Sequence, residues 1–340
     1  MPRRVSTPPA GDPEALDLRE RLLAGAVPLP GYTPGDPLDL RLLGIGESHV
    51  AWLVSYSPEE RVDRVLRIPR HPVDQMPRPM PWEYAALTRV PAEVGTQGLL
   101  MSDSADNPLG RRYILSTFVP GQPKPIAQWT NEDLARFAAT LVRLHRETGD
   151  VHGPVASPET GPINVVASME EGWVWWSDHE PTIVVRPEVQ ALWSNVRSFV
   201  DAHAQAISTI DRFPLVHADS CATNVLFDGD DVRLIDWEWA EFSDPARDLA
   251  LIGGEIHGGP WYVPLAPDRI DRFLIAYADL AGISQADRPG LNLRRQTWMV
   301  YERFMSWLLV LSRQRTHPGS GYADTSAMMR QTLQRFLGMD

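Results

Sequence analysis

The sequence predicts an α+β protein of two lobes, a small lobe rich in antiparallel β-strands followed by a larger, mainly helical lobe. Short β-rich runs separated by turn-forming residues fill the stretch from Leu38 to Val119. Helix-period patterns dominate from Thr130 onwards. The proline-rich stretch "VPGQPKP", 119–125, separates the two textures. We therefore divide the chain into an N-terminal extension, 1–29, a β-rich lobe, 30–120, and a helical lobe, 121–340.

Composition limits the class of protein and of partner. The chain has 340 residues, 43% of them hydrophobic, which is enough for two domains with sizeable cores. Its 32 basic and 44 acidic residues give a formal net charge of −12, and like charges do not cluster in blocks. This balance argues against a nucleic-acid partner and favours cationic or neutral ligands.

Cysteine content and hydropathy indicate the cellular compartment that we expect for the protein. A single cysteine, Cys221, excludes an intramolecular disulfide and a Cys-rich zinc site, and it fits a reducing cytosol. The N-terminal stretch "MPRRVSTPPAGDPEAL" has no apolar core, and the apolar run "WLLVL", 307–311, is too short to span a bilayer. We expect no signal peptide, no membrane segment and a cytoplasmic protein.

The extension and the β-rich lobe are predicted from local signals. Asp12 followed by Pro13 is typical of a helix N-terminus, so one helix is expected in the extension. Four strands are expected in "LDLRLLGIG", "HVAWLVSY", "RVLRIP" and "RYILSTFV", with a helix over 82–89. The proline-rich segment 69–81 is expected to be a loop without regular structure.

The helical lobe begins with a capped, amphipathic helix in "TNEDLARFAATLVRLHRE". Thr130 and Asp133 have the spacing of a capping box, with Asp in the usual place of Glu. Apolar residues then recur every three or four positions, as in a helix with one buried face. These residues are Leu134, Phe137, Leu141 and Leu144.

Polar residues that suit metal and phosphate chemistry gather in "LVHADSCATNVLFDGDDVRLIDWEWA", 215–240. Two short apolar runs flank "DGDD" and predict a hairpin, which brings its two ends together. Asp219 and Asn224 then project from one loop, and Asp236 projects from the end of the following strand. Three converging oxygen-bearing side chains suit Mg²⁺, which holds the phosphates of a nucleotide and keeps several of its waters.

The motifs "HADSCATN", 217–224, and "IDWE", 235–238, resemble the catalytic core of the aminoglycoside phosphotransferase and choline kinase-like family, which shares the protein-kinase fold. The resemblance spans residues 38–252. Ala218 stands where the family usually has glycine. The resemblance implies that the two lobes form a protein-kinase-like fold, with a nucleotide-binding first lobe and a catalytic, acceptor-binding second lobe.

The same resemblance implies roles for the residues of the second lobe. Asp219 is the catalytic base that orients the acceptor hydroxyl, while Asn224 and Asp236 hold Mg²⁺. Asp248, in "DPARDLA", corresponds to a buried aspartate at a helix start that bonds backbone amides of the catalytic loop. His217 is expected to brace this loop rather than to move protons.

In the first lobe, "LLGIGESHVAWLV" places a Gly-x-Gly turn between two strand-like runs. By itself this pattern is weak evidence of phosphate binding. Its order relative to the downstream motifs makes it a plausible nucleotide-phosphate flap, in which Gly44, Gly46 and Ser48 lie near the phosphates.

Further nucleotide contacts are implied downstream of this turn. Arg67 stands where most kinases have lysine, and it is expected to pair with Glu83 and to contact the α- and β-phosphates. A planar guanidinium does not replace a compact ammonium without readjustment. The adenine is expected to bond backbone groups around Thr117 and Val119.

Other reactive or aromatic residues have simpler interpretations. Cys221 is expected to be a packed, inert thiol, and His145 to be a helix C-terminal cation or a core contact. The tryptophans are expected to be mostly core, with a cage for an amino cation as the alternative. Acidic residues close to the motif could line an acceptor pocket, Glu238 and Glu241 first, then Asp244 and Glu302.

We therefore interpret the chain as an Mg²⁺-dependent O-phosphotransferase that uses ATP or GTP and phosphorylates a small hydroxyl compound, cationic or neutral. An aminoglycoside-type antibiotic is the first candidate acceptor. The alternatives are a metabolic kinase for choline, a sugar or another amino alcohol, and a kinase for a macrolide or a nucleoside. A nucleotide-binding module without activity is a third hypothesis, motivated by Arg67.

Overall fold

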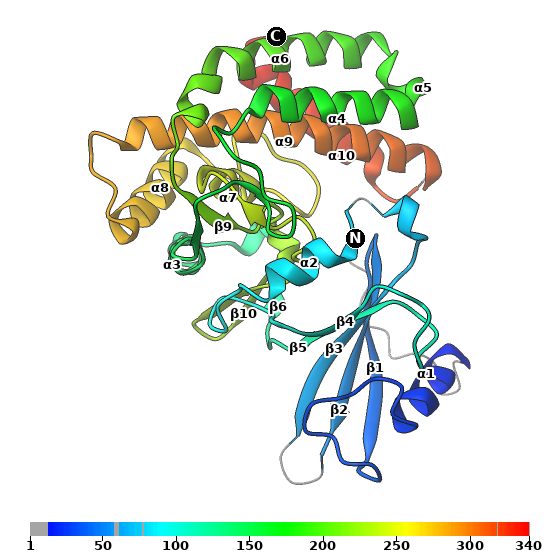
Figure 1. The fold of residues 1–340 in the computed structure, drawn as a ribbon. Coiled ribbons are helices and arrows are strands. Elements are labelled where there is room, and N and C mark those ends of the chain that lie inside the picture. Colours follow the sequence, from blue (N-terminus) through cyan, green and yellow to red (C-terminus); the bar gives the residue numbers. More distant parts are fainter. Residues whose placement is uncertain (1–12, 58–60, 77, 318, 340) are drawn as a thin grey trace. The chain divides into compact units, whose positions relative to one another are not determined.

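The computed structural model describes residues 13–57, 61–76, 78–317 and 319–339. Within it the chain forms two compact units, the first ending at Pro120 and the second beginning at Gly121 (Figure 1). The predicted N-cap Asp12 lies outside the described residues.

The first unit contains a five-stranded antiparallel sheet with the strand order β1-β2-β3-β5-β4. Its strands are β1 (Leu38–Ile45), β2 (His49–Tyr56), β3 (Val62–Pro69), β4 (Gly98–Ser102) and β5 (Tyr113–Thr117). The four expected strands are confirmed. The edge strand β4 was not predicted, because it is short and all five of its residues are only partly buried.

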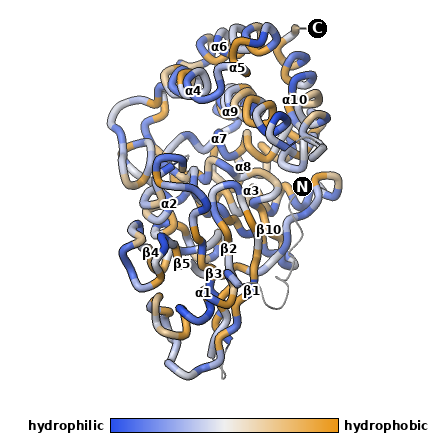
Figure 2. The backbone as a smooth tube through the Cα atoms, turned by 90° about the vertical axis from the view of Figure 1, so that its right-hand side faces the viewer, coloured by the Kyte–Doolittle hydropathy of each residue, from blue (hydrophilic) through white to orange (hydrophobic). Residues whose placement is uncertain are grey.

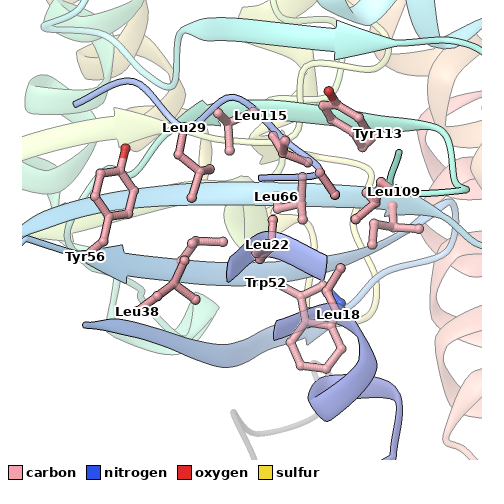
Figure 3. Packing of buried hydrophobic residues seen from close by; sticks show 14 residues of the cluster. Leu18, Leu22, Leu29, Leu38, Trp52, Tyr56, Leu66, Leu109, Tyr113 and Leu115 are labelled. Carbon is pink, nitrogen blue, oxygen red and sulfur yellow. The ribbon is translucent and has the colours of Figure 1, made fainter. Parts of the chain in front are cut away.

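Helix α1 (Pro13–Leu23) covers one face of this sheet. Its Leu18 and Leu22 are buried in a cluster with Trp52 of β2, Leu66 of β3 and sheet neighbours (Figure 3). Burying an aliphatic side chain of this size contributes roughly 1.5–3 kcal/mol. The amphipathic N-terminal helix therefore belongs to the core of the first unit.

The proline-rich connection after β3 is more regular than expected. It contains a 3₁₀ turn, η1 (Val73–Gln75), and helix α2 (Met80–Leu87) begins inside the stretch predicted to be a loop. The predicted helix over 82–89 was therefore placed two residues too late. Pro81 fits the first helical turn because the N–H that proline lacks has no partner within a helix at that position.

Helices dominate the second unit (Figure 1). They are α3 (Asn131–Leu144), α4 (Val165–His179), α5 (Pro181–Val184), α6 (Pro187–Ser208), α7 (Ala246–Leu251), α8 (Pro267–Ala281), α9 (Arg288–Thr316) and α10 (Tyr322–Phe336). Helix α9 packs against α6, α7 and α10, and α3 packs against α8. Hydrophobic and hydrophilic stretches alternate along α4, α6 and α10, as expected for helices with one face on a core (Figure 2).

The capping box of α3 is confirmed. The Thr130 hydroxyl accepts a hydrogen bond from the Asp133 N–H at 3.1 Å, and the Asp133 carboxylate accepts one from the Thr130 N–H at 2.8 Å.

No helix in the described ranges is long and apolar enough to cross a membrane.

Short strands and turns in the second unit position the polar loops. One sheet has the order β7-β9-β12-β8, and another has the order β11-β10-β6. These strands are β6 (Gln122–Pro123), β7 (Thr148–Gly149), β8 (Gly153–Pro154), β9 (Phe213–Val216), β10 (Val225–Asp228), β11 (Asp231–Leu234) and β12 (Glu241–Phe242). A parallel pair, β13 (Gly253–Gly254) and β14 (Val263–Pro264), and the 3₁₀ turns η2 (Ile126–Gln128) and η3 (Ala222–Asn224) complete the unit. The predicted β10–β11 hairpin is confirmed, because Asp228 pairs with Asp231 at its end.

Candidate active site

The loop 217–224 leaves the buried strand β9 and ends in η3, directly before the β10–β11 hairpin. Asp248, at the start of α7, is fully buried and holds the first residues of this loop. Its carboxylate accepts hydrogen bonds from the N–H groups of His217, at 2.8 Å, and Ala218, at 2.9 Å. The expected bonding of loop amides by Asp248 is confirmed.

The Asp248 carboxylate is itself supported by His145. The His145 Nε2 lies 3.1 Å from Asp248 Oδ2, and Nδ1 lies 2.7 Å from the Tyr277 hydroxyl. Burial raises the pKa of Asp248, but the hydrogen bond and charge of His145 and the contacts with His217 lower it below its ordinary value. His145 is therefore a core contact at the end of α3.

His217 braces the loop from within, as expected. Its Nε2 lies 2.9 Å from the Ile235 carbonyl oxygen, and its Nδ1 accepts a hydrogen bond from the Asp219 N–H. Burial lowers the pKa of His217, so the imidazole is neutral, with the proton on Nε2. Trp237 packs on the ring, with the two ring centroids 4.4 Å apart.

Two residues of the site have left-handed backbone conformations. Ala218 has φ +57° and Asp236 has φ +70°. Such angles cost a non-glycine residue roughly 1–2 kcal/mol, and they persist where the surrounding structure holds them. The departure from glycine at position 218 therefore strains the loop in a conformation that glycine adopts freely.

Asp219 and Asn224 contact each other directly. The Asn224 Nδ2 donates to the Asp219 carboxylate at 2.8 Å and to the Asp219 main-chain carbonyl at 2.9 Å. Burial, followed by the negative charges of Asp236, Glu238 and Glu302, raises the pKa of Asp219 well above its ordinary value. The three predicted oxygen-bearing side chains are thus brought together within one strongly negative region.

The donor set of this region fits a divalent cation. A carboxylate and an amide oxygen are ligands that Mg²⁺ accepts, and a positive charge would offset the repulsion that raises the pKa of Asp219. In the described residues no group of three His, Cys, Asp or Glu side chains could hold a metal ion. Asn224 and Asp236 would offer Mg²⁺ one amide oxygen and one carboxylate, and Mg²⁺ commonly completes such a set with water and phosphate oxygens.

The acidic residues after Asp236 differ in their surroundings. Glu241 of β12 contacts the Arg247 guanidinium at 2.5 Å, and Glu302 of α9 contacts it at 2.7 Å. Burial lowers the pKa of Arg247, but the charges of Glu302 and Glu241 outweigh it and raise the pKa above its ordinary value. One cation therefore joins two of the candidate acceptor-facing carboxylates.

Asp244, a further candidate for the acceptor pocket, uses its carboxylate in contacts within the second unit. It is fully buried, and its carboxylate accepts hydrogen bonds from the Trp298 indole N–H, at 3.0 Å, and from Arg294. It also accepts one from the Ala246 N–H at the start of α7. Asp244 therefore links α7 to α9.

Several tryptophans lie in the core, and two partly buried ones stack on each other. Trp298 and Trp307 are buried, and each donates its indole N–H to a side chain inside the fold. Trp173 stacks on Trp193 with the ring centroids 4.4 Å apart and an interplanar angle of 6°. The cysteine is packed as expected, because Cys221 is buried and burial raises the pKa of its thiol.

The glycine-containing turn of the first unit connects β1 and β2. The Gly46 N–H donates to the His49 carbonyl at 2.9 Å. The carbonyls of the turn contact the end of β3: Arg70 contacts those of Gly46 and Ser48, and His71 contacts that of Glu47. Arg70 and His71, which follow β3, therefore hold the backbone of this turn in place.

Arg67 of β3 forms an ion pair with Glu83 of α2, the pairing that the sequence suggested. Its other terminal nitrogen lies 3.1 Å from Nδ1 of His49, the first residue of β2. Glu83 and His49 are both buried. No local pattern indicates a role for His49, because its contact joins two strands across 18 residues.

The residues expected to contact the adenine lie at the end of β5 and just beyond. The Thr117 N–H donates to the Gln97 carbonyl, and its hydroxyl accepts from the Gln97 N–H, both at 2.9 Å. Val119 is buried. The amide of Thr117 is therefore already used within the first unit.

The sequence was compared with protein families and with curated proteins. The sequence model of the phosphotransferase enzyme family matches residues 39–293. No relative was found among curated proteins.

Solved structures resemble the whole chain. A choline kinase from Cryptosporidium parvum is 13% identical with a TM-score of 0.64, covering 94% of this chain and 96% of its own. An ethanolamine kinase from Plasmodium vivax is 12% identical with a TM-score of 0.64, covering 89% and 84%. A GDP complex of an aminoglycoside 2′-phosphotransferase is 14% identical with a TM-score of 0.60, covering 95% and 99%. At these identities the likeness shows the fold, so the expected protein-kinase-like fold is confirmed.

Proposed function

Since the chain belongs to the phosphotransferase enzyme family, we propose that it moves the γ-phosphoryl group of ATP or GTP to a hydroxyl of a small cationic molecule. Within this family, we favour an antibiotic of the aminoglycoside type as the acceptor. The carrying observation is the bond from Asn224 to Asp219 within a cluster of carboxylates.

Asp219 is the base in this proposal. The acceptor hydroxyl donates a hydrogen bond to the Asp219 carboxylate, and its proton passes to Asp219 as the new oxygen–phosphorus bond forms. The bond between the γ-phosphorus and the bridging oxygen breaks, which leaves a nucleoside diphosphate and a phosphate monoester. The raised pKa of Asp219 suits a group that must take up this proton.

Asn224 and Asp236 are the proposed Mg²⁺ ligands. With Nδ2 of Asn224 bonded to Asp219, its Oδ1 points away from that carboxylate, as the planar amide requires. Mg²⁺, when bound, would neutralise charge on the phosphates. The left-handed backbone at Asp236 sets the direction of the second ligand.

The nucleotide contacts of the first unit are proposed at Gly44, Gly46, Ser48, Arg67 and Glu83. Gly44 does not have a left-handed φ, and a Cβ added there would meet no heavy atom of the described residues within 4 Å. Neither packing nor backbone angle requires glycine at this position, and close approach of a phosphate gives it a reason. We place the nucleobase beside the backbone at Val119, with Thr117 at the same strand end.

The acceptor is proposed to be cationic because several carboxylates gather around Asp219. Glu238 and Glu302 raise the pKa of Asp219, and Glu241 and Glu302 share the single charge of Arg247. An ammonium group close to the reacting hydroxyl would reduce this negative potential. No lysine follows Lys124 in the sequence.

Phosphoryl transfer to matched cationic and neutral acceptors tests the proposal. With Mg²⁺ and ATP or GTP, we expect turnover of aminoglycosides and a rise in their KM as salt approaches 0.5 M, where the Debye length is roughly 4–5 Å. Efficient turnover of a neutral macrolide, sugar or nucleoside instead, with a salt-independent KM, would reject the cationic acceptor. Preference for choline over aminoglycosides would favour a metabolic kinase.

A further inference from the structure

The buried imidazole of His49 is paired with a cation. His49 opens β2 with 4% of its surface exposed, and its Nδ1 lies 3.1 Å from a terminal nitrogen of Arg67. Arginine is a donor only, so Nδ1 must accept this hydrogen bond and cannot carry a proton. His49 is therefore neutral while this contact exists, with its hydrogen on Nε2, 4.0 Å from the Glu83 carboxylate.

Three elements thus meet at the Arg67 guanidinium. Glu83 of α2 contacts one terminal nitrogen, and His49 of β2 contacts the other. A single contact to Glu83 would let the planar group rotate about that bond, whereas contacts at both arms fix its plane. A lysine ammonium has no plane to fix, so a second anchor matters only when arginine occupies this position.

We propose that His49 is a positioning residue, which orients the Arg67 guanidinium for the phosphates of the nucleotide. The inference rests on the proposed function, because it assigns Arg67 to nucleotide binding. It also supplies the readjustment that an arginine needs in place of the usual lysine. His49 itself contacts no reacting atom.

A structural role for His49 alone makes different predictions. Loss of packing would lower the stability of the first unit whatever residue stands at position 67. Orientation of the guanidinium, in contrast, requires arginine there, so the effect on nucleotide binding must depend on the identity of residue 67. A double-mutant cycle separates the two roles.

The experiment measures Mg-nucleotide affinity and the two KM values of the full chain for His49→Leu, His49→Asn, Arg67→Lys and the double variant H49L/R67K. We expect His49→Leu to weaken nucleotide binding about tenfold or more, the loss expected for a hydrogen bond to a charged group. The acceptor KM should change less than twofold. His49→Asn should restore most of the affinity, because its Oδ1 can take the place of Nδ1 as acceptor.

In the Arg67→Lys background, His49→Leu should change nucleotide affinity less than threefold. A matched control is Ser55→Ala, which removes another partly buried hydrogen bond of β2, from Ser55 to Asp63. This control should lower the melting temperature while nucleotide affinity stays within twofold of the wild type.

Equal losses in both backgrounds, or an unchanged affinity in His49→Leu, would overturn the inference alone, because the wild type would still bind nucleotide. If His49→Leu does not fold, His49→Ala and H49A/R67K replace it in the cycle: a loss of nucleotide affinity only when residue 67 is arginine supports the inference, and equal losses in both backgrounds overturn it. A wild-type chain that binds no nucleotide would overturn the proposed function and this inference together.

Discussion

The side-chain amide of Asn224 donates to Asp219 at two points, the carboxylate at 2.8 Å and the main-chain carbonyl at 2.9 Å. This pair of bonds joins Asp219 to η3, in which Asn224 lies, and fixes the direction of the carboxylate. The proposed base is therefore held in place before any acceptor binds, as positioning catalysis requires.

Replacing Asp219 by asparagine should abolish most phosphoryl transfer and leave nucleotide binding nearly intact. Asparagine keeps an oxygen that can accept from Asn224 but cannot take up a proton, so we expect a loss of about 10²–10⁴-fold in kcat. Mg-nucleotide affinity should stay within threefold by equilibrium titration. Transfer retained within tenfold would remove Asp219 from the role of base.

The Asp236→Ala substitution should weaken both nucleotide binding and turnover, because it removes a charged ligand of the proposed Mg²⁺ site. Asp236→Ala should therefore lose nucleotide affinity as well as turnover, whereas Asp219→Asn should lose turnover alone. Titration with nucleotide in the presence and absence of Mg²⁺ measures this. An Mg²⁺-dependent affinity equal to that of the wild type would contradict the assignment.

The acid limb of the pH–rate profile should respond to Glu238. Burial raises the pKa of Asp219 most, and the charges of Asp236, Glu238 and Glu302 raise it further, well above the ordinary value of 3.8. Because the base must be ionised, activity should be lost as the pH falls through this raised pKa. Glu238→Gln removes one of these charges and should move the acid limb of kcat/KM to lower pH. The exposed Glu20→Gln on α1 is the control and should not move it. A shift of the limb to higher pH in Glu238→Gln would refute the electrostatic account.

Glycine at position 218 should be tolerated or stabilising. Ala218 has φ +57°, which strains an alanine, so Ala218→Gly should raise the free energy of unfolding by up to about 1 kcal/mol. The neighbouring Ala222 is buried in η3 without a left-handed φ, so Ala222→Gly should lower it by about 1 kcal/mol. Chemical denaturation of both variants measures the difference. Equal destabilisation by the two glycines would show that position 218 is not strained.

Local patterns predicted the parts of the fold that local interactions determine. The capping box of Thr130 and Asp133 and the hairpin at Asp228 and Asp231 each depend on residues three apart, and both were predicted. Strand β4 was missed because its five residues lie at a sheet edge and are only partly buried. Helix α2 begins earlier than predicted, because prolines usually indicate a loop but Pro81 fits the first helical turn.

The candidate site shows the same division between near and distant contacts. Asp219 and Asn224 are five residues apart, and the sequence predicts that both project from one loop. The pairing of Arg247 with Glu302 spans 55 residues, and that of Asp244 with Trp298 spans 54. Only folding reveals that Asp244 is buried and that Arg247 joins two carboxylates, because no periodicity connects such distant positions.

The central claim is that Asp219 and its neighbours transfer phosphate to a small molecule, and the most direct measurement is product detection by mass spectrometry. The wild type and Asp219→Asn are each incubated with Mg²⁺, ATP or GTP, and a panel of aminoglycosides, amino alcohols, sugars, macrolides and nucleosides. The account predicts one acceptor class that gains a single phosphoryl group with the wild type and hardly any with Asp219→Asn. Equal phosphorylation by both proteins, or a wild type that binds nucleotide and phosphorylates no acceptor, would contradict it.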